Sequence, residues 1–306
     1  MEGSYNKTDF AFVEGKDKKA NEIVRPSETY WQDAKRRLKE NKVAMISLVV
    51  IILVLVMAVV GPFISKFDYA TNELLNANKW PDKIHWFGTD DLGRDIFVRV
   101  MYGARISLSV GLVAAFINLT IGVIYGGVAG YYGGNVDNVM MRIVDVLYSV
   151  PMMLYVILLM VVLGKGLINV FITLGIIYWV GMARIVRGQV LSLKEQEFVL
   201  AAKASGASKK RIILRHLIPN CMGQIVVTLT LSIPEAIFTE AFLSFIGLGV
   251  ASPMSSLGTL CNDALSTYRS YPYQIFIPAL AICITMVAFN LFGDGLRDAL
   301  DPKMRK

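Results

Sequence analysis

The sequence predicts an all-α integral membrane protein with six transmembrane helices and with both chain ends on the cytosolic side. Three observations lead to this fold class: the composition, the length of the apolar runs and the distribution of basic residues. Of the 306 residues, 55% are hydrophobic, and the mean hydropathy is +0.52. Several apolar runs reach the roughly 20 residues that a helix needs to cross a hydrocarbon core about 30 Å thick.

The first elements in chain order are a polar segment, a span and an outer segment. Residues 1–42 are polar and mixed in charge, and we expect a cytosolic segment there. They contain no apolar core that ends in a small-residue cleavage site, so we expect no signal peptide and a retained first span. Residues 43–64 are uncharged throughout and would form a helix roughly 33 Å long. An extracytoplasmic segment is expected over 65–104.

The remaining spans fall within a membrane core over 105–294. We place them at 105–131, 139–163, 168–187, 222–246 and 275–294. A polar loop over 188–219 separates the fourth span from the fifth, and a short tail covers 295–306. Each of these runs is long enough to be read as one membrane-crossing helix.

The basic residues set the orientation of these spans. With the N-terminus inside, 23 of the 31 Lys and Arg residues fall on the cytosolic side and eight on the outer side. Cytosolic loops carry an excess of Lys and Arg, so both chain ends are predicted inside. We therefore attribute the net charge of +7 to the basic residues that orient the chain in the lipid bilayer, and we expect no nucleic-acid partner.

Glycines in the second span recur at a spacing of four. Gly122, Gly126, Gly130 and Gly134 would lie on one helix face and form a smooth strip. Such a strip lets another helix backbone approach closely. Two readings stay open, packing against a helix of the same chain or an interface with another subunit.

Ionisable residues inside spans are functional candidates because their burial in lipid is costly. Arg142 and Asp145 are three residues apart, so they could neutralise each other on one helix face. Glu235 and Glu240 have no local basic partner. We consider them candidates for the wall of a polar translocation path, with a hydrogen-bonded packing role as the alternative.

The outer segment contains a dense group of charges over 88–95. Asp90 and Asp91 stand beside Arg94 and Asp95, with glycines on both sides, so local ion pairing is easy. We therefore expect this stretch to be ordered and functional. The alternative is a solvated charged loop.

Catalytic and metal-binding motifs are missing from the sequence. It has no phosphate-binding loop, no zinc-protease motif and no nucleophile-elbow motif. We interpret Cys221, Cys261 and Cys283 as small apolar fillers, because they are scattered and form no ligand pattern. The sequence thus predicts a chain that is not an enzyme, binds no metal or cofactor itself and draws any energy from a partner.

The cytosolic loop over 195–217 has a distinct pattern of its own. Residues 195–205 are rich in alanine and favour a helix, which Gly206 can end in a left-handed conformation. Ser208 can cap a second helix that is basic and amphipathic. A basic amphipathic helix alone could lie on anionic lipid, but the alanine and glycine residues favour docking to a partner.

The spacing of this loop resembles the coupling loop of ABC importer permeases. In that family E-A-A is followed by three residues, Gly, nine residues and I-x-L-P. The corresponding positions here are Leu200, Ala201, Ala202, Gly206 and Pro219. Leu200 replaces the usual Glu, and Glu197 is close enough to compensate for the missing acid.

Three further stretches are similar to the C-type permeases of dipeptide and oligopeptide importers. They read HWFGTDDLGRDIFVRVMYGARISLSVG at 85–111, MMRIVDVLYSVP at 140–151 and TEAFLSFIGLGVASPMSSLG at 239–258. The similarity covers nearly the whole chain from about residue 30. Nickel importer permeases share these strings, so nickel is an alternative substrate.

The resemblance implies a fold, partners and a location. The fold would be that of a type I ABC importer permease in a bacterial or archaeal cell membrane. The chain would pair with a second permease and bind two cytosolic ATPases, which hold ATP and magnesium, through 195–217. An extracytoplasmic binding protein would deliver peptide to 65–105 and 247–274.

Two rival functions need different sequence features. A secondary transporter driven by an ion gradient would need ion ligands at the midplane and usually an internal repeat. No convincing repeat is visible. A membrane scaffold without transport would not need the docking loop.

Overall fold

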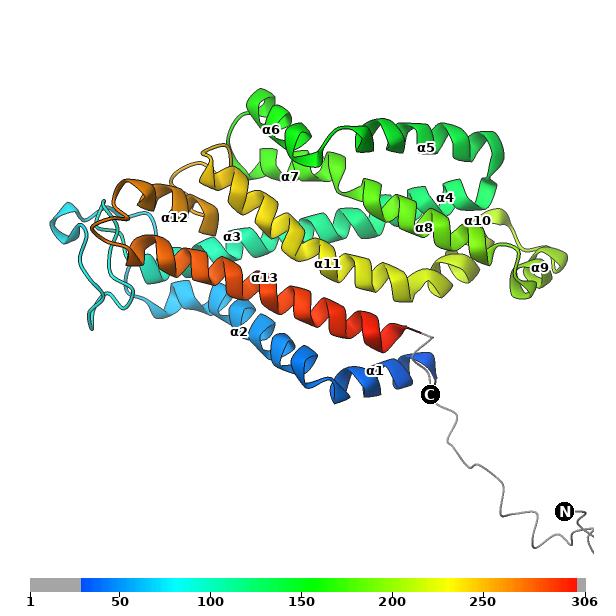
Figure 1. Ribbon diagram of the computed structural model, residues 1–306, viewed down its shortest axis with the longest axis horizontal. Helices are drawn as coiled ribbons and strands as arrows, with labels where there is room; N and C mark the ends of the chain where they lie inside the picture. Colours follow the sequence, from blue (N-terminus) through cyan, green and yellow to red (C-terminus); the bar gives the residue numbers. More distant parts are fainter. Residues whose placement is uncertain (1–28, 302–306) are drawn as a thin grey trace, which may run out of the picture.

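The computed structural model describes residues 29–301, which form an elongated bundle of helices (Figure 1). Five helical stretches in this part of the chain are long and apolar enough to cross a membrane. They are Lys42–Ile64, Ile96–Tyr132, Leu167–Leu193, Lys209–Phe245 and Tyr273–Leu300. A bent pair of shorter helices gives up to six spans. The prediction of an all-α membrane protein is confirmed. Most of the polar segment that we expect over 1–42 lies outside the described part.

One group of helices forms the lower half of the bundle in Figure 1. It consists of α2 (Lys42–Ile64), α3 (Ile96–Ile117), α11 (Ile218–Phe245) and α13 (Tyr273–Leu300). The helix α13 packs between α2 and α11, and α3 contacts both α2 and α11. Phe97, Leu108, Ile237 and Phe289 are buried at the centre of this group. The side of α2 away from these contacts carries exposed apolar residues, as expected of a surface that faces lipid.

A second group packs along the opposite side. The helix α3 continues through a π-helical turn, η4, into α4, and α7 continues into α8. The bounds are η4 Asn118–Gly122, α4 Val123–Tyr132, α7 Leu167–Ile177 and α8 Trp179–Leu193. The helix α4 lies against α8 over most of its length. Met182, Val186 and Val190 of α8 form a buried core with Val123 and Ile225.

The span that we expect over 139–163 is sharply bent. Two helices, α5 (Gly134–Ser149) and α6 (Met152–Leu163), occupy this region and meet at an angle of 83°. Val150 between them is extended, with φ −98° and ψ 135°. Pro151 explains the break, because proline lacks an N–H donor and disfavours the helical conformation of the residue before it.

The glycine strip packs within this chain. A Cβ on Gly126 would lie 2.3 Å from the carbonyl oxygen of Ala183 in α8, and a Cβ on Gly122 or Gly130 would lie within 3.0 Å of α8 atoms. Gly134 does not belong to the strip: α4 ends before it, its φ is +52°, and nothing lies within 4 Å of a Cβ there. The regular spacing of four fails at this point because Gly133 turns the chain into α5.

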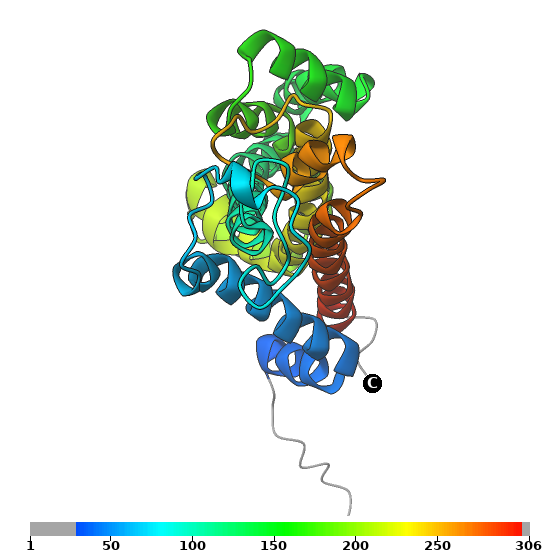
Figure 2. The same cartoon turned by 90° about the vertical axis from the view of Figure 1, so that its left-hand side faces the viewer.

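The two ends of the bundle differ in structure. At one end the irregular segment between α2 and α3, with η3 (Leu74–Asn76), lies beside α12 (Leu257–Asp263) and η6 (Ala264–Ser266) (Figure 2). At the other end lie α1 (Tyr30–Glu40), the end of α13 and the loop with α9 (Glu197–Ala204), α10 (Lys209–Ile212) and the π-helical turn η5 (Ile213–Leu217). The hydroxyl of Tyr30 donates to the carbonyl of Leu300 at 2.8 Å, so both ends of the described chain meet on the side of this loop.

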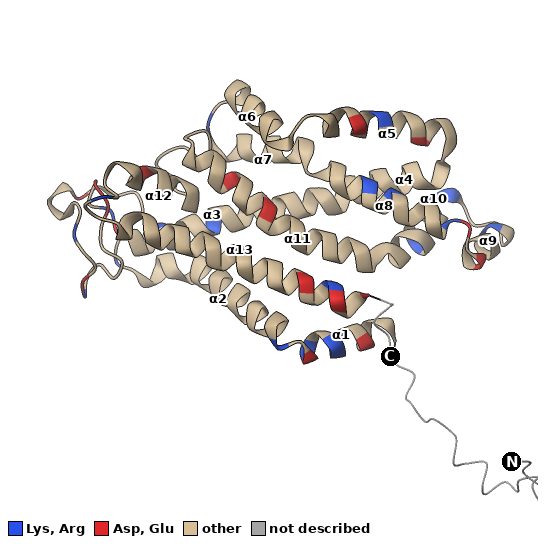
Figure 3. Ribbon diagram, in the orientation of Figure 1, with Lys and Arg blue, Asp and Glu red and all other residues tan. Residues whose placement is uncertain are grey.

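Charged residues gather at the two ends and along α5 and α8, and they leave the middle of α2 and α13 uncharged (Figure 3). This arrangement suits a bundle whose waist lies in hydrocarbon. It also places the basic 195–217 loop and the outer segment at opposite ends of the bundle, which agrees with the orientation that the charge distribution predicts.

Cysteine labelling tests this orientation. In a variant without the native cysteines, we expect an impermeant thiol reagent to label Leu75→Cys in intact cells and to spare Lys210→Cys. Leu75 is 99% exposed in the outer segment, and Lys210 is exposed in the opposite loop. Labelling of Lys210→Cys only after the membrane is permeabilised is the control, and its labelling in intact cells would contradict the topology.

Candidate functional site

The 195–217 loop forms the helix–glycine–helix that the sequence predicts. The first helix, α9, is shorter than expected, and Gly206 follows it with a φ of +77°. The hydroxyl of Ser208 accepts a hydrogen bond from the backbone N–H of Arg211 at 3.3 Å and caps α10. The ammonium of Lys209 lies 5.0 Å from the ring centre of Tyr132 at the end of α4. The loop is thus a folded part of the bundle.

The exposed face of α9 is apolar at its centre. Val199 is fully buried in the core with α8 and α11, so it anchors α9. Phe198 and Leu200 are 38% and 47% exposed. Ala201 is exposed beside them, which leaves a low, apolar surface for a partner.

The structure separates the predicted coupling residues into two sets. Glu197, Leu200, Ala201 and Gly206 are exposed. Ala202 differs, because it is partly buried and packs against the same core as Val199. Ala202 therefore holds α9 in place, and a bulky substitution there would disturb the fold as well as a docking surface.

Pro219 lies at the start of α11, in its first turn, where a missing N–H does no harm. It lines a hollow of about 550 Å³ between α1, α11 and the end of α13. The residue is exposed and lies apart from α9. Its position fits the return of the chain into the membrane.

A larger cavity of about 730 Å³ opens between the bent α5–α6 pair, the α7–α8 helix and α11. Its wall contains a polar row on α11: Gln224, Thr228, Ser232 and Glu235. These residues recur every three or four positions, so they share one helix face. Glu235 is exposed on this face and lines the cavity, as a residue of a translocation path would.

Glu240 does not reach the cavity. It is fully buried, and its carboxylate accepts hydrogen bonds at 2.7 Å from the hydroxyls of Ser107 and Ser244. The Ser107 bond ties α11 to α3. The structure thus favours the packing alternative for Glu240, which sequence reasoning could not decide because Ser107 is remote along the chain.

The predicted pair of Arg142 and Asp145 is wrong. Asp145 instead accepts a hydrogen bond from Arg184 of α8 at 2.6 Å. One turn further along α8, Arg187 donates two bonds of 2.6 Å to Asp137. Both pairs join α5 to α8, so two arginines of α8 fasten the bent α5–α6 pair to the bundle.

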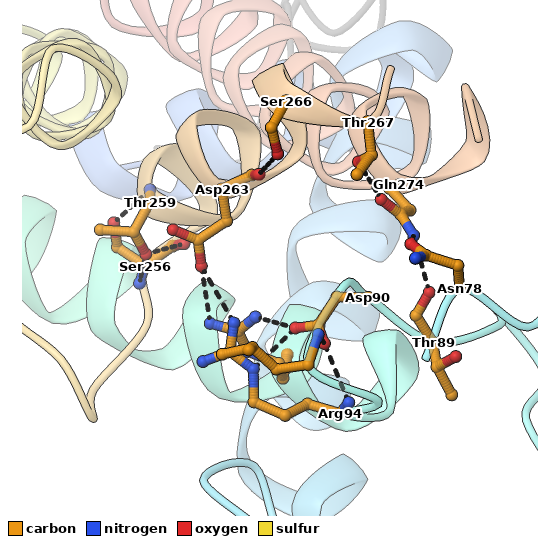
Figure 4. A network of polar contacts seen from close by, with 12 residues as sticks. Asn78, Thr89, Asp90, Arg94, Ser256, Thr259, Asp263, Ser266, Thr267 and Gln274 are labelled. Atoms are coloured by element: carbon orange, nitrogen blue, oxygen red, sulfur yellow. Dashed lines mark hydrogen bonds and ion pairs between the residues drawn. The ribbon is translucent and has the colours of Figure 1, made fainter. Parts of the chain in front are cut away.

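The outer segment contains a buried ion network that joins it to α3 and α12 (Figure 4). The carboxylate of Asp90 accepts from the Nε of Arg94 at 2.7 Å and also from Arg99. The Nη2 atoms of Arg94 and Arg99 donate to Asp263 of α12 at 3.3 and 3.1 Å. The expected pairing of Asp90 with Arg94 is present, but no sequence pattern indicates that Arg99 and Asp263 join it.

Two further contacts hold the same segment. Asp95 caps α3 by accepting from the backbone N–H of Val98 at 3.0 Å, and its other oxygen lies 2.9 Å from the Nδ1 atom of His85. The Nε2 atom of Gln274 in α13 donates to the carbonyl of Thr89 at 2.9 Å. The stretch 88–95 is therefore an ordered joint between helices.

Two outer carboxyl groups have shifted pKa values. Backbone N–H groups of His85 and Ile84 donate to Asp82 and hold the pKa of its carboxyl below the usual range. Desolvation and the neighbouring negative charge of Asp90 raise the pKa of Asp91. The two adjacent aspartates therefore have different surroundings: Asp90 is buried in ion pairs with two arginines, and Asp91 is exposed beside it.

No group of three His, Cys, Asp or Glu residues that could hold a metal ion occurs within residues 29–301. Cys221 and Cys261 are buried, Cys283 is exposed, and all three are free thiols. The functional features of the described residues are the cavity, the exposed apolar face of α9 and the ordered outer segment.

Comparison with known families agrees with this arrangement. Residues 119–306 match the family described as "Binding-protein-dependent transport system inner membrane component". Residues 29–81 match the N-terminal TM domain of oligopeptide transport permease C. Together the two matches cover most of the described chain.

Individual relatives are similar over almost their whole length. The oligopeptide transport system permease protein OppC of Bacillus subtilis (strain 168) is 55% identical over 287 residues, which is 94% of each chain. The dipeptide transport system permease protein DppC of the same strain is 54% identical over 298 residues, covering 97% of this chain and 93% of the relative. OppC of Escherichia coli (strain K12) is 45% identical over 90% of this chain and 92% of its own.

The fold is also similar to a solved structure, an inward-facing conformation of the MetNI methionine ABC transporter. The TM-score is 0.54 at 20% identity, over 66% of this chain and 96% of that chain. The helices and the family matches identify a multi-pass protein of the bacterial cell membrane with the type I importer fold. From the extent of these matches, the chain belongs to the dipeptide and oligopeptide (C-type) permease family of ABC importers, the inner membrane components of binding-protein-dependent transport systems.

Proposed function

We propose that this chain forms half of the translocation path of an ATP-driven importer of dipeptides and oligopeptides. The observation that carries the proposal is the folded α9–Gly206–α10 loop, whose exposed apolar surface is fixed to the helices that line the cavity. The relatives are named as oligopeptide and dipeptide permeases, which supports a peptide substrate over nickel.

The partners follow from the surfaces. Cytosolic ATPase subunits, which hold ATP and magnesium, dock on the exposed face of α9. A second permease completes the cavity, to which this chain contributes α5–α6, α7–α8 and α11. An extracytoplasmic binding protein delivers peptide to the outer segments 65–105 and 247–274. This chain itself holds no cofactor in the proposed complex.

The buried contacts of α9 provide a route for coupling. Val199 packs in one core with Met182 and Val186 of α8 and with Ile225 of α11. Both helices also line the cavity. A movement of α9 imposed by ATPase closure therefore shifts the cavity wall directly, because close-packed cores transmit displacement.

Transport by the reconstituted importer tests this function. With the partner subunits and ATP on the cytosolic side, we expect vesicles to take up labelled peptide without an ion gradient. An importer without ATP is the control. Uptake of nickel in place of peptide, or peptide uptake that follows a proton gradient in the absence of ATP, would contradict the proposal.

A further inference from the structure

Two oppositely charged side chains line the cavity. Glu235 is on α11, and Arg297 is on the last turn of α13. Both residues are exposed. Within residues 29–301, neither side chain makes a hydrogen bond or an ion pair. A membrane cavity with one free acid and one free base is suited to a ligand that carries both charges.

The two charges lie at different depths. Gln224, Val227 and Arg297 line both the cavity and the neighbouring hollow at the cytosolic end, and Gly293, one turn before Arg297, packs against Leu231 of α11. Arg297 therefore lies at the level of residues 224–227, and Glu235 is eight to eleven residues further along α11. At about 1.5 Å per residue, the two levels are about 12–16 Å apart along the helix.

A third polar group lies between these levels. The Oδ1 atom of Asn118 lines the cavity and is buried without a hydrogen-bond partner. On the same side of the bundle, Gly111 packs against Ile233 of α11 and Gly127 packs near Ile218, which puts Asn118 beside the middle of α11. A buried amide oxygen without a donor is costly, so it is suited to receive an N–H group from a ligand.

The backbone around Asn118 is also irregular. This residue begins the π-helical turn η4, and such turns occur often at functional sites. Opposite the polar row of α11, the cavity wall offers apolar side chains such as Met152, Ile177 and Ile185. This apolar part of the wall can accept side chains of many kinds, because its contacts are not directional.

We propose that this cavity recognises the two charged ends of an extended peptide of about four or five residues. Glu235 binds the α-ammonium group, Arg297 binds the terminal carboxylate, and Asn118 accepts one backbone N–H. An extended chain covers about 3.3–3.6 Å per residue, so four or five residues match a spacing of about 12–16 Å. The inference rests on the proposed function and adds to it which peptide groups the permease contacts.

The orientation and the length preference follow from the same geometry. The carboxylate end faces the cytosol, because Arg297 lies at the end of the bundle that also contains α1 and the 195–217 loop. A dipeptide reaches one of the two charges only. Side-chain identity matters little, which suits a transporter of mixed peptides.

Equilibrium binding to the complete nucleotide-free importer, without its binding protein, tests the proposal. We expect Glu235→Gln to weaken binding of radiolabelled pentaalanine roughly tenfold, the loss of one charge-assisted contact. The same variant should bind N-acetylated pentaalanine as the unmodified importer does. Arg297→Gln should show the matching pattern with C-amidated pentaalanine. Asp298→Asn, which alters the neighbouring residue outside the cavity wall, should change none of these affinities.

Several outcomes would overturn the proposal. One is equal loss of binding for free and capped peptides, and another is an unmodified importer that binds free and capped peptides equally. Absence of measurable pentaalanine binding, or dialanine binding as tight as pentaalanine binding, would have the same consequence. ATP-driven uptake by the unmodified importer is measured separately, so a failure of this proposal is distinguishable from a failure of the proposed function.

Discussion

Gly206→Val is expected to abolish peptide uptake while the protein still accumulates in the membrane. Gly206 has a φ of +77°, a conformation that a β-branched residue resists at a cost of about 1–3 kcal/mol. Nothing lies within 4 Å of a Cβ at this position, so backbone conformation and not space is the reason. Loss of the bend between α9 and α10 would misplace the docking face without touching a membrane span. Uptake and co-purification of the ATPases are the measurements.

Matched variants identify the cause of this loss. Gly206→Asn should keep most activity, because asparagine tolerates the left-handed conformation. Ala201→Arg, on the exposed face of α9, should also abolish ATPase retention by placing a charge in the interface. If the loop instead lies on lipid, both Ala201→Arg and Gly206→Val will be tolerated, and replacing the basic residues Lys209, Lys210 and Arg211 by Gln will abolish uptake.

Asp90→Ala is expected to destabilise the protein by about 3–5 kcal/mol, because it leaves the buried Arg94 and Arg99 with too few anions. Arg99 is only 2% exposed, so water cannot replace the lost carboxylate. Asp263 remains as a partner for both arginines but is itself partly exposed. The midpoint of thermal unfolding in detergent and the amount of protein in the membrane should both fall.

The neighbouring residue supplies the control for this variant. Asp91 is exposed and makes no ion pair within residues 29–301, so Asp91→Asn should leave the unfolding midpoint almost unchanged. Equal stability of the Asp90→Ala and Asp91→Asn variants would show that the network does not hold the outer segment. A loss of uptake in Asp91→Asn at normal stability would point to a surface role for that carboxylate.

Asp90 and Asp145 show how far ion pairs can be predicted from a sequence pattern. Local pairing of Asp90 with Arg94 follows from their spacing, and the structure contains it. A spacing of three residues similarly assigns Asp145 to Arg142, yet Asp145 pairs with Arg184 of another helix. The geometry of a short turn fixes the first pair, whereas an exposed helix face leaves the second open to any cation that packs nearby.

The candidate site was predictable in the loop and only partly in the cavity. Gly206 and Ser208 identify a bend and a cap because these residues have specific local uses. The sequence also singled out Glu235 as a charge within a span. Arg297 and Asn118 could not be singled out in this way. Arg297 belongs to the predicted tail and Asn118 is uncharged, and only the fold brings both to one cavity.

The sequence by itself determined the all-α class, the membrane location, the helix–glycine–helix of the 195–217 loop and the family. These properties depend on composition and short-range patterns, which the chain carries wherever it folds. Only the tertiary structure decided that α5 and α6 form a bent pair and that the glycines pack on α8. It also decided that Glu240 is buried against Ser107, and that Glu235, Asn118 and Arg297 share a cavity. These features depend on which helix faces meet, and that is set by close packing between segments far apart in the chain.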